Sequence, residues 1–444
     1  MKTNYLIPLL LALLSLGACI SPQDEATDCP ECDEQQIVIK LASDNAPATR
    51  AGRPLTGNEP NQDVDRVMLI VCKVEEGTDN NQIVYTKLLT DWMTSSEIYI
   101  DQNDRRGRTD RVRLREEEQL PKGSYKVYAI AYTYKDKDTD NQTQYKVEEK
   151  SLNDYCAALA ASFTDKTFNE NLILSLTDAP GEELFAGSQD FTVYETGFTT
   201  QVVLNRQVAG VYLYVEDIPY YEGLAKLRLM PAADNDGLVL GQFANEDIAV
   251  NGQGTKELYV MNGTTPATPV KPLCEIELAD WFTNGTVTQD GNLVSTENWK
   301  QPDYYPEKNY TFKKGSFFGG SFVIPFAASG TTTTNSLKIQ LVSKNNDTEK
   351  VEKEWSVKLP ENDLSTDISA WNGTTFTTSS VTESVTNYSL LRNHLYCIGN
   401  KSTDKNAEQD IPQSLYDQVD IQLKVIAEWD IIYDMVLEPD SSRQ

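Results

Sequence analysis

The stretch GSYKVYAIAYTY, residues 123–134, shows the pattern that decides the fold. It is rich in Tyr, Val and Ile, and these residue types suit pleated strands better than helices. Comparable alternating or apolar runs recur along the whole chain. They are QIVIKL (36–41), DRVMLIVCKV (65–74), TTQVVL (199–204), AGVYLYVEDI (209–218), SFVIPFA (321–327), SLKIQLVS (336–343), KEWSVKL (353–359) and DIQLKVIAEWDII (420–432). Clusters of Gly, Asn and Asp between the runs suit turns, so we expect an all-β protein of antiparallel β-sandwiches.

The length of the chain and a break between two strand runs indicate two domains. At 444 residues the chain exceeds one ordinary core, since single domains usually hold about 100 to 200 residues. One strand run ends near Arg206, and AGVYLYVEDI begins the next. We therefore predict an N-terminal sandwich over residues 36–205 and a C-terminal sandwich over residues 206–444.

A single stretch fits a helix better than a strand. SLNDYCAALAASF, residues 151–163, is rich in Ala and Leu, and Ser151 or Asn153 can cap its start. We expect this helix to connect two strands and to pack on a sheet.

The charge balance excludes one class of partner. The 39 basic and 67 acidic residues give a net charge of −28, which repels the phosphates of nucleic acids and anionic lipid headgroups. One local exception is RRGRTDRVRLREEE, residues 105–118, where six arginines precede three glutamates. The glutamates partly neutralise the arginines, so we interpret the segment as a charged loop, with a docking site for an acidic partner as the alternative.

The N-terminus carries a signal for export and lipid attachment. Lys2 precedes the apolar run LIPLLLALLSLGA, which is too short to span a membrane and is typical of a secretory signal peptide over residues 1–18. Leu16-Gly17-Ala18-Cys19 forms a lipobox, so Cys19 is predicted to carry a diacylglycerol after cleavage. Several acyl chains together anchor a protein firmly. Residues 19–35 are polar and acidic, as expected of a tether.

The other cysteines give weaker signals. Cys29 and Cys32 have C-x-x-C spacing but lie in the acidic tether, without the strand and helix that redox motifs require. Zinc needs a second pair of ligands, and the sequence offers no other C-x-x-C or paired histidine. A local disulfide or an idle pair is therefore predicted. The remaining cysteines, at positions 72, 156, 274 and 397, are too scattered to pair by inspection.

The sequence offers few candidates for catalytic or metal-binding residues. His394 is the only histidine, so every mechanism with a histidine base must use it. Its context, LRNHLYCI, alternates like a buried strand. The sequence has no G-x-S-x-G motif, and DKDTDN (136–141) lacks the glycine and glutamate of a calcium loop. We predict no catalytic residue, no metal site, no cofactor and no enzymatic activity.

Several of these pieces together resemble the fimbrillin superfamily of Bacteroidota-type fimbriae, including the FimB-type anchoring subunits. The resemblance begins at Cys19 and the Asp28-Cys29-Pro30 feature and covers most of the chain in order. Its other parts are DRVMLIVCKV, LPKGSYKVYAIAYT (120–133), LFAGSQDFTVYETG (184–197), LNRQVAGVYLYVED (204–217), RNHLY (392–396) and AEWDII (427–432). The resemblance assigns His394 to a structural strand.

The resemblance implies two tandem transthyretin-like β-sandwich domains, export as an outer-membrane lipoprotein, and assembly with other fimbrial subunits by donor-strand exchange. The candidate donor is DIQLKVIAEWDIIYDMVLE, residues 420–438. Stalk subunits of the family lose their lipid and first strand by cleavage after an arginine, and Arg50-Ala51 stands at a suitable distance after QIVIKL. Anchor subunits keep the lipid, and the features near Cys19 favour an anchoring or accessory subunit. A surface receptor on a host or bacterial cell is a further expected partner.

The alternative from another class is a surface glycan-binding lipoprotein, which also consists of β-sandwiches behind a lipobox. Such a protein stacks sugars on exposed aromatic rings. The candidate platforms are Trp281, Trp299, Trp355 and Trp371.

Overall fold

The computed structural model describes the chain from Glu34 onwards with several gaps. The described residues are 34–44, 64–74, 81–100, 106–134, 145–176, 182–231, 237–240, 257–260, 271–305, 311–325, 337–358, 368–371, 376–379, 390, 395–401, 409–416, 420–422 and 424–426. The signal peptide, Cys19, Cys29, Cys32, Arg50, Ala51 and His394 lie outside them.

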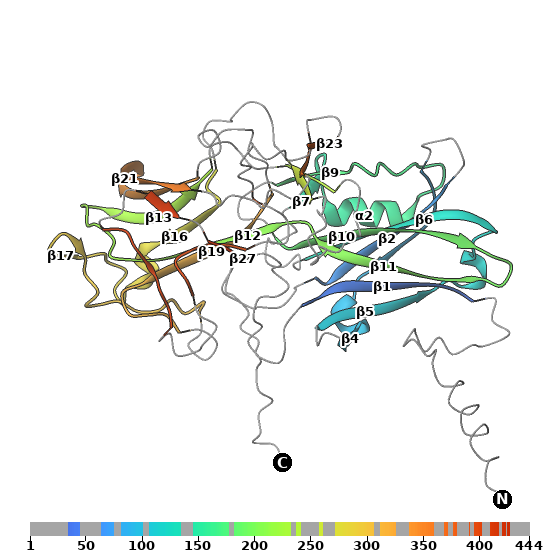
Figure 1. Cartoon of the computed structure of the whole chain (residues 1–444), viewed down its shortest axis with the longest axis horizontal. Coiled ribbons are helices and arrows are strands. Elements are labelled where there is room, and N and C mark those ends of the chain that lie inside the picture. The colour runs from blue at the N-terminus through green and yellow to red at the C-terminus, as the bar shows by residue number, and fades with distance from the viewer. Residues whose placement is uncertain are drawn as a thin grey trace, which may run out of the picture.

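The N-terminal half of the chain forms an eight-stranded sheet in the order β3-β2-β6-β10-β11-β1-β5-β4. The strands are β1 (Gln35–Asp44), β2 (Arg66–Lys73), β3 (Gln82–Leu89), β4 (Glu97–Ile100), β5 (Arg106–Arg113), β6 (Gly123–Tyr132), β10 (Leu184–Val193) and β11 (Phe198–Arg206). The sheet folds over on itself, because Ile39 of β1 and Leu69 of β2 belong to one buried cluster although four strand pairings separate them in the sheet order. In Figure 1 these strands occupy the right-hand part of the molecule, with β4 and β5 below β2 and β6.

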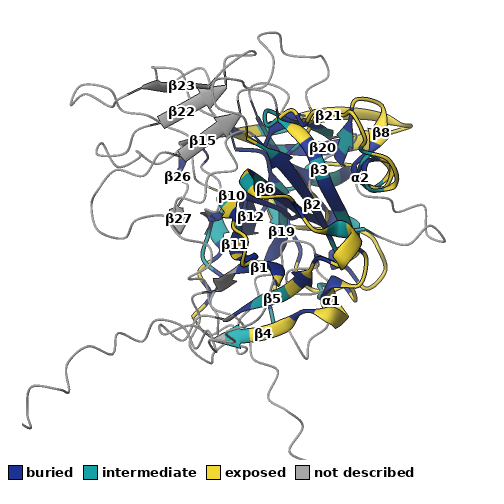
Figure 2. Cartoon of the chain, turned by 90° about the vertical axis from the view of Figure 1, so that its right-hand side faces the viewer, coloured by how far each residue is buried: buried dark blue, intermediate teal, exposed yellow. Residues whose placement is uncertain are grey.

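The strands β2 and β6 are buried on both faces. Val67 and Leu69 pack toward β1, whereas Met68 and Ile70 join a second cluster on the other side. Figure 2 accordingly shows β2 in dark blue, while β4 and α1 (Trp92–Ser95) include exposed residues at the rim. Apolar runs without polar alternation are the pattern expected of strands that are covered twice.

The second face of β2 and β6 is covered by helix α2 (Leu152–Ala161). Its N-cap is Ser151, whose side-chain oxygen accepts a hydrogen bond from the backbone N–H of Asp154 at 3.0 Å, the usual way to satisfy a free helical donor. Leu152, Cys156 and Leu159 point into the second cluster. The predicted helix, its cap and its packing on a sheet are confirmed.

A small sheet in the order β14-β9-β7-β8 lies near this helix. Its strands are β7 (Tyr145–Val147), β8 (Lys150–Ser151), β9 (Ile173–Leu176) and β14 (Gly237–Val239). Since β14 follows β11 in sequence, a segment from the predicted C-terminal half joins the cluster of the N-terminal half through Leu238, Val239 and Leu240.

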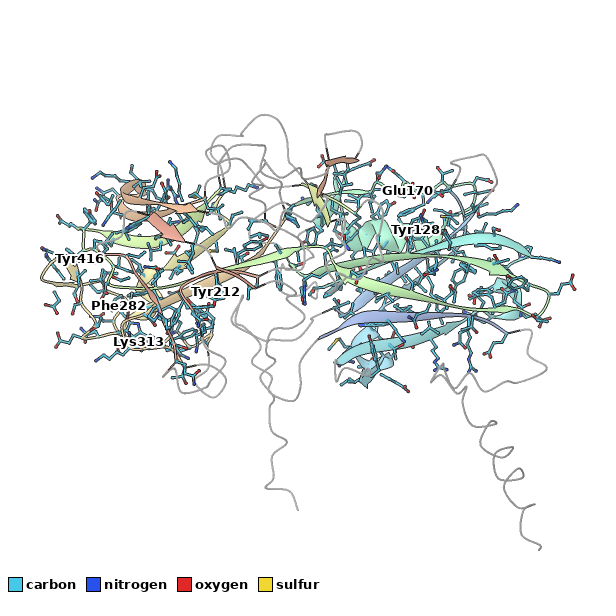
Figure 3. All side chains as sticks on the ribbon, in the orientation of Figure 1. Tyr128, Glu170, Tyr212, Phe282, Lys313 and Tyr416 are labelled. Carbon is cyan, nitrogen blue, oxygen red and sulfur yellow. The ribbon has the colours of Figure 1, made fainter. Side chains whose placement is uncertain are left out.

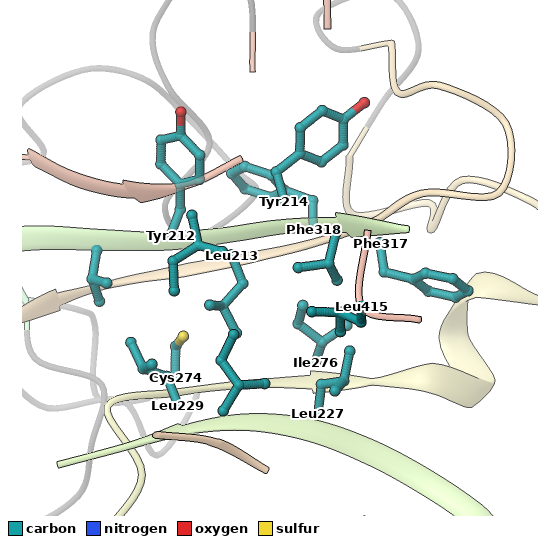
Figure 4. Packing of buried hydrophobic residues seen from close by; sticks show 14 of the residues in the cluster. Tyr212, Leu213, Tyr214, Leu227, Leu229, Cys274, Ile276, Phe317, Phe318 and Leu415 are labelled. Atoms are coloured by element: carbon teal, nitrogen blue, oxygen red, sulfur yellow. The ribbon is translucent and has the colours of Figure 1, made fainter. Parts of the chain in front are cut away.

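The C-terminal half consists of two facing sheets. One has the order β19-β12-β24-β27, with β25 also paired to β12, and the other has the order β16-β13-β20-β21-β26. The strands of the first are β12 (Ala209–Glu216), β19 (Phe317–Val323), β24 (Leu395–Ile398), β25 (Gln413–Ser414) and β27 (Lys424–Ile426). Those of the second are β13 (Leu224–Met230), β16 (Cys274–Glu277), β20 (Leu337–Asn345), β21 (Thr348–Lys358) and β26 (Asp420–Gln422). Figure 4 shows Leu213 of the first sheet above Leu227 and Ile276 of the second.

Shorter elements complete the described part. They are η1 (Glu116–Glu118), η4 (Leu278–Trp281), β17 (Gln289–Asp290), β18 (Leu293–Val294), β15 (Glu257–Val260), β22 (Ile368–Trp371) and β23 (Phe376–Ser379). The last three form a sheet in the order β15-β22-β23.

The predicted all-β sandwich class is confirmed. Most strand pairs are antiparallel. Parallel pairs join β1 to β11, β12 to β24, β12 to β25, β15 to β22 and β21 to β26. The strands of each parallel pair are far apart in sequence, so no tight hairpin forces them to run antiparallel. The last strand of the first sheet ends at Arg206 and β12 begins at Ala209; the division into two domains at this point stays a prediction.

Two interpretations of local sequence were wrong. The arginine-rich segment is not a loop, because residues 106–113 form strand β5 between β1 and β4. The run DIQLKVI is not one strand either: β26 pairs with β21 in one sheet and β27 pairs with β24 in the other. In both cases the pairing partners decide the outcome, and they lie elsewhere in the chain.

Candidate functional site

The first described strand, β1, is an interior strand of its sheet. From Gln35 to Leu41 it runs parallel to Phe198–Leu204 of β11, and its other edge pairs antiparallel with β5, where Ile37 faces Val112. The backbone groups on both edges of β1 are therefore used in strand pairing. A strand from the start of the fold closes a gap between two strands that come later in the sequence (Figure 1).

One face of β1 fills the core of the N-terminal half. Ile37, Ile39 and Leu41 have 0% exposure and pack in the same cluster as Trp92 and Phe198. Burial of each such side chain contributes about 1.5–3 kcal/mol. Packing and backbone pairing together hold β1 in place.

The start of β1 is fixed by a buried glutamine. The Gln35 side-chain amide Nε2 donates to the Leu120 carbonyl at 2.9 Å, and its Oε1 accepts from the Leu120 backbone N–H at 2.7 Å. The Phe198 N–H donates to the Glu34 carbonyl at 3.1 Å. Close beside it, Gly197 has φ +83°, and a Cβ there would lie 2.4 Å from the Glu34 oxygen. Only glycine allows this approach.

The opposite face of β1 is covered in part by Tyr99 of β4. The Tyr99 hydroxyl donates to the Leu41 carbonyl at 3.1 Å, and Lys40 Nζ lies 5.4 Å from the centre of the Tyr99 ring. The ring passes over Gly107 of β5, where an added Cβ would meet ring carbons at 2.7 Å. Tyr99 thus bridges β5 and ties β4 to β1.

The chain leaves β1 at Asp44, and the next described residue is Val64. Arg50 and Ala51, the predicted processing site, belong to the intervening segment outside the described residues. A cut there would leave β1 attached to the rest of the protein by hydrogen bonds and packing alone.

Three arginines in or just after β5 make contacts within the fold. Arg108 donates to the Met93 carbonyl at 3.1 Å, Arg113 pairs with Glu34 at 2.7 Å, and Arg115 pairs with Glu117 at 3.4 Å. Arg111 is exposed on the strand. Two of the six arginines of the segment, Arg113 and Arg115, are thus paired with carboxylates, and the docking alternative stays a prediction.

The C-terminal candidate donor is paired within its own chain as far as it is described. Asp420–Gln422 lie parallel to Ser356–Lys358 of β21, and Lys424–Ile426 lie antiparallel to Leu395–Cys397 of β24. Ile421 is 1% exposed and belongs to the C-terminal core. Residues 427–438 of the candidate lie outside the described residues.

The tryptophans named for sugar stacking are mostly unavailable. Trp281 and Trp355 have exposures of 0% and 1%, and Trp299 packs at 5.9 Å from Trp281 while its Nε1–H donates to the Ser316 carbonyl at 2.8 Å. The side chain of Trp371 lies outside the described set. Core packing explains these rings better than sugar binding does.

A shallow cavity of about 440 Å³ lies beside η4. Its lining includes Asp280, Lys300 and Tyr304, and the Tyr304 hydroxyl donates to Asp280 Oδ2 at 3.3 Å. Burial, together with the Asp280 charge, raises the pKa of the Tyr304 hydroxyl well above its usual value. The groups in this cavity bind one another and form no arrangement of nucleophile and base.

The described thiols are structural. Cys72, Cys156, Cys274 and Cys397 are all buried. Burial raises the pKa of Cys156 and of Cys274 to about 12, so these thiols are protonated and unreactive near neutral pH. The pairing of Cys29 with Cys32 stays a prediction.

In the described ranges of the chain, no group of three or more His, Cys, Asp and Glu side chains lies close enough to hold a metal ion. None of the helices there is both long and apolar enough to cross a membrane. Around His394, residues 395–398 form the buried strand β24, in agreement with the strand predicted for this region.

Sequence comparison finds no matching protein-family model and no matching curated protein. Solved structures align over most of the chain at low identity. A fimbrial assembly protein from Parabacteroides distasonis is 9% identical, with 83% of this chain and 92% of that chain covered and a TM-score of 0.34. The tip fimbrial protein Mfa3 from Porphyromonas gingivalis is 10% identical, with 89% and 99% covered and a TM-score of 0.33. The fimbrial anchor protein Mfa2 from the same organism is 9% identical, with 73% and 97% covered and a TM-score of 0.30.

All three neighbours are described as fimbrial proteins. The FimB-type assignment, the lipid at Cys19 and the processing at Arg50 stay predictions.

Proposed function

We propose that the protein is a structural subunit of a fimbrium, anchored in the outer membrane by a lipid on Cys19 and joined to neighbouring subunits by strand exchange. The observation that carries this proposal is the placement of β1. It is a strand from the start of the fold, paired on both edges, whose connection to the next described element contains Arg50.

Removal of β1 would create a strand-shaped acceptor. The facing edges of β11 and β5 would lose their backbone partners, and the cluster around Trp92 would lose Ile37, Ile39 and Leu41. An incoming strand with alternating apolar residues restores both kinds of contact, which is the physical basis of strand addition.

The candidate donor has a pattern similar to that of β1. In QIVIKL the apolar residues Ile37, Ile39 and Leu41 alternate, with Lys40 between the last two. In DIQLKVI the residues Ile421, Leu423 and Val425 alternate in the same way, with Lys424 between the last two. An extended strand with this pattern presents one apolar face. The donor of one subunit would therefore suit the place that β1 occupies in another.

The anchoring role and the stalk role differ in the fate of β1. An anchoring subunit keeps Cys19, its lipid and β1, so it ends the polymer at the membrane. A stalk subunit is cut after Arg50, and β1 leaves with the lipid. The lipobox and the Asp28-Cys29-Pro30 feature favour the anchoring or accessory role.

The test is the intact mass and N-terminal identity of the protein isolated from the outer membrane of its own host. A lipidated chain that begins at Cys19 supports the anchoring subunit, and a lipid-free chain that begins at Ala51 supports the stalk subunit. A Cys19→Ala variant serves as the control, because it cannot be lipidated. An unlipidated chain with another start that does not co-purify with other subunits contradicts the proposal.

A further inference from the structure

A buried lysine and a buried aspartate meet beside the sheet that holds β24. Lys401 Nζ lies 3.0 Å from Asp410 Oδ1, and the two side chains have exposures of 6% and 0%. The adjoining backbone fixes this approach, because Asn400 and Ile411 exchange two hydrogen bonds of 2.8 Å each. This backbone pairing of the adjacent residues holds the two side chains together.

Aromatic side chains surround this buried pair. Lys401 Nζ lies 5.6 Å from the centre of the Phe312 ring, and its backbone N–H donates to the Tyr212 hydroxyl at 3.3 Å. Tyr212 and Tyr214 point to the same side of β12, opposite Leu213 (Figure 4). Figure 3 shows Tyr212 and Lys313 in this same part of the molecule.

A third group contacts the aspartate. The Tyr214 hydroxyl donates to Asp410 Oδ2 at 2.7 Å and accepts from the Lys313 backbone N–H at 3.1 Å. Ser316 Oγ lies 3.2 Å from the same hydroxyl. Tyr214 and Ser316 both have 0% exposure. The carboxylate is thus held by an amine on one oxygen and by an oriented phenol on the other.

The burial of this ion pair costs free energy. Removal of two charges from water costs free energy that their attraction only partly returns. Condensation of the amine and the carboxyl into an amide would remove both charges, and groups held in contact react far more readily than the same groups in solution.

We propose that Lys401 Nζ and Asp410 Cγ are joined by an intramolecular isopeptide bond. A proton passes from the ammonium to Oδ1, and the neutral amine attacks Cγ. The Tyr214 hydroxyl stabilises the negative charge that develops on Oδ2, as a fixed donor does in acyl transfer. A second amine proton then passes to Oδ1, which leaves as water, and the third stays on the amide nitrogen. The condensation needs no oxidant and no further reactant.

The bond would shorten the path of force through the C-terminal half. Residues 402–409 would lie inside a closed ring, so tension between β24 and the C-terminal strands would pass through the amide and bypass them. This mechanical role rests on the proposed fimbrial function, whereas the bond itself does not. The experiment below detects the bond whether or not the protein is a fimbrial subunit.

The experiment is the intact mass of the purified full chain under denaturing conditions, followed by tryptic peptide mapping. The bond lowers the mass by about 18 Da, one water, and it blocks cleavage after Lys401. A branched peptide that joins residues 393–405 to residues 406–424 is then expected. The full sequence mass overturns the proposal. A mass loss with normal cleavage after Lys401 also overturns it, because that result indicates a succinimide.

An internal control and two variants sharpen the test. Lys338 Nζ and Glu354 Oε1 are 2.6 Å apart but lie at the surface, with side-chain exposures of 45% and 36%, so their peptides should be unmodified. Lys401→Arg keeps the positive charge and should restore the full mass. Tyr214→Phe keeps the ring and should lower the cross-linked fraction of freshly made protein. An unchanged fraction in Tyr214→Phe would overturn the role given to the hydroxyl.

Discussion

At the scale of single residues, burial decides which chemical groups are available. The four described thiols show this most clearly, because none of them is at the surface. Cys156 lies on the buried face of helix α2, and Cys274 lies in the core between the C-terminal sheets. Their positions in sequence gave no indication of a common role, and the structure explains why: each fills space in a different strand or helix.

We expect the native protein to resist thiol reagents at these four positions. Since burial raises the pKa of Cys156 and Cys274 to about 12, the reactive thiolate is about one part in ten thousand at pH 8. Labelling with iodoacetamide at pH 8 should leave all four unmodified in buffer and modify all four in urea. A Cys29→Ser/Cys32→Ser variant removes the other two thiols of the mature tether. Rapid labelling of the folded variant would contradict the buried placement.

The residues around the Lys401–Asp410 pair could not be grouped from the sequence. Tyr214, Ser316, Lys401 and Asp410 come from four separate stretches, and no spacing rule connects them. Each alone is an ordinary polar residue in a strand or turn. Their chemistry arises only when the sheets bring them together.

At the scale of elements, strands with apolar residues on both faces were predictable and charged strands were not. The strands β2, β6 and β12 follow directly from their runs, because such runs gain free energy in any doubly covered sheet. The strand β5 holds four of the six arginines of this segment, and only its pairing with β1 and β4 makes it a strand. The strand β1 was recognisable from its alternation, but its place between β11 and β5 depends on partners far along the chain.

The two faces of β1 should differ in their contribution to stability. Ile39 has 0% exposure and shares a cluster with Trp92, so Ile39→Ala should lower the free energy of unfolding by about 2–5 kcal/mol. Val38, the matched control, points to the half-buried face, and Val38→Ala should cost less than about 1 kcal/mol. Urea unfolding followed by tryptophan fluorescence measures both. Equal effects of the two changes would mean that the packing of β1 differs from the one described.

At the scale of the whole molecule, the two halves share apolar packing. The cluster beneath α2 includes Val208, Leu238 and Ile324 together with Met68 and Ile70. The buried ion pair between Arg206 and Glu183, 2.7 Å apart, lies at the same junction. Because shared cores resist bending, force applied at one end should pass to the other through this junction rather than through a loose linker.

The last prediction concerns the exchange of β1 for a donor strand. Limited trypsin digestion should cut the chain after Arg50, while β1, paired on both edges, should stay bound without a covalent link. A synthetic peptide of residues 420–438 in excess should then displace it, since both strands alternate apolar residues with the same spacing. Native mass spectrometry would detect the loss of the β1 fragment and the gain of the peptide.

The control peptide carries Ser in place of Ile421, Leu423 and Val425. It keeps every backbone donor and acceptor but loses the apolar face, so it should leave β1 in place because the cluster around Trp92 would stay unfilled. Displacement by both peptides would mean that backbone pairing alone drives the exchange. If β1 stays bound in the presence of either peptide, strand exchange at this acceptor is contradicted. That result would mean that the donor peptide cannot replace the strand already bound.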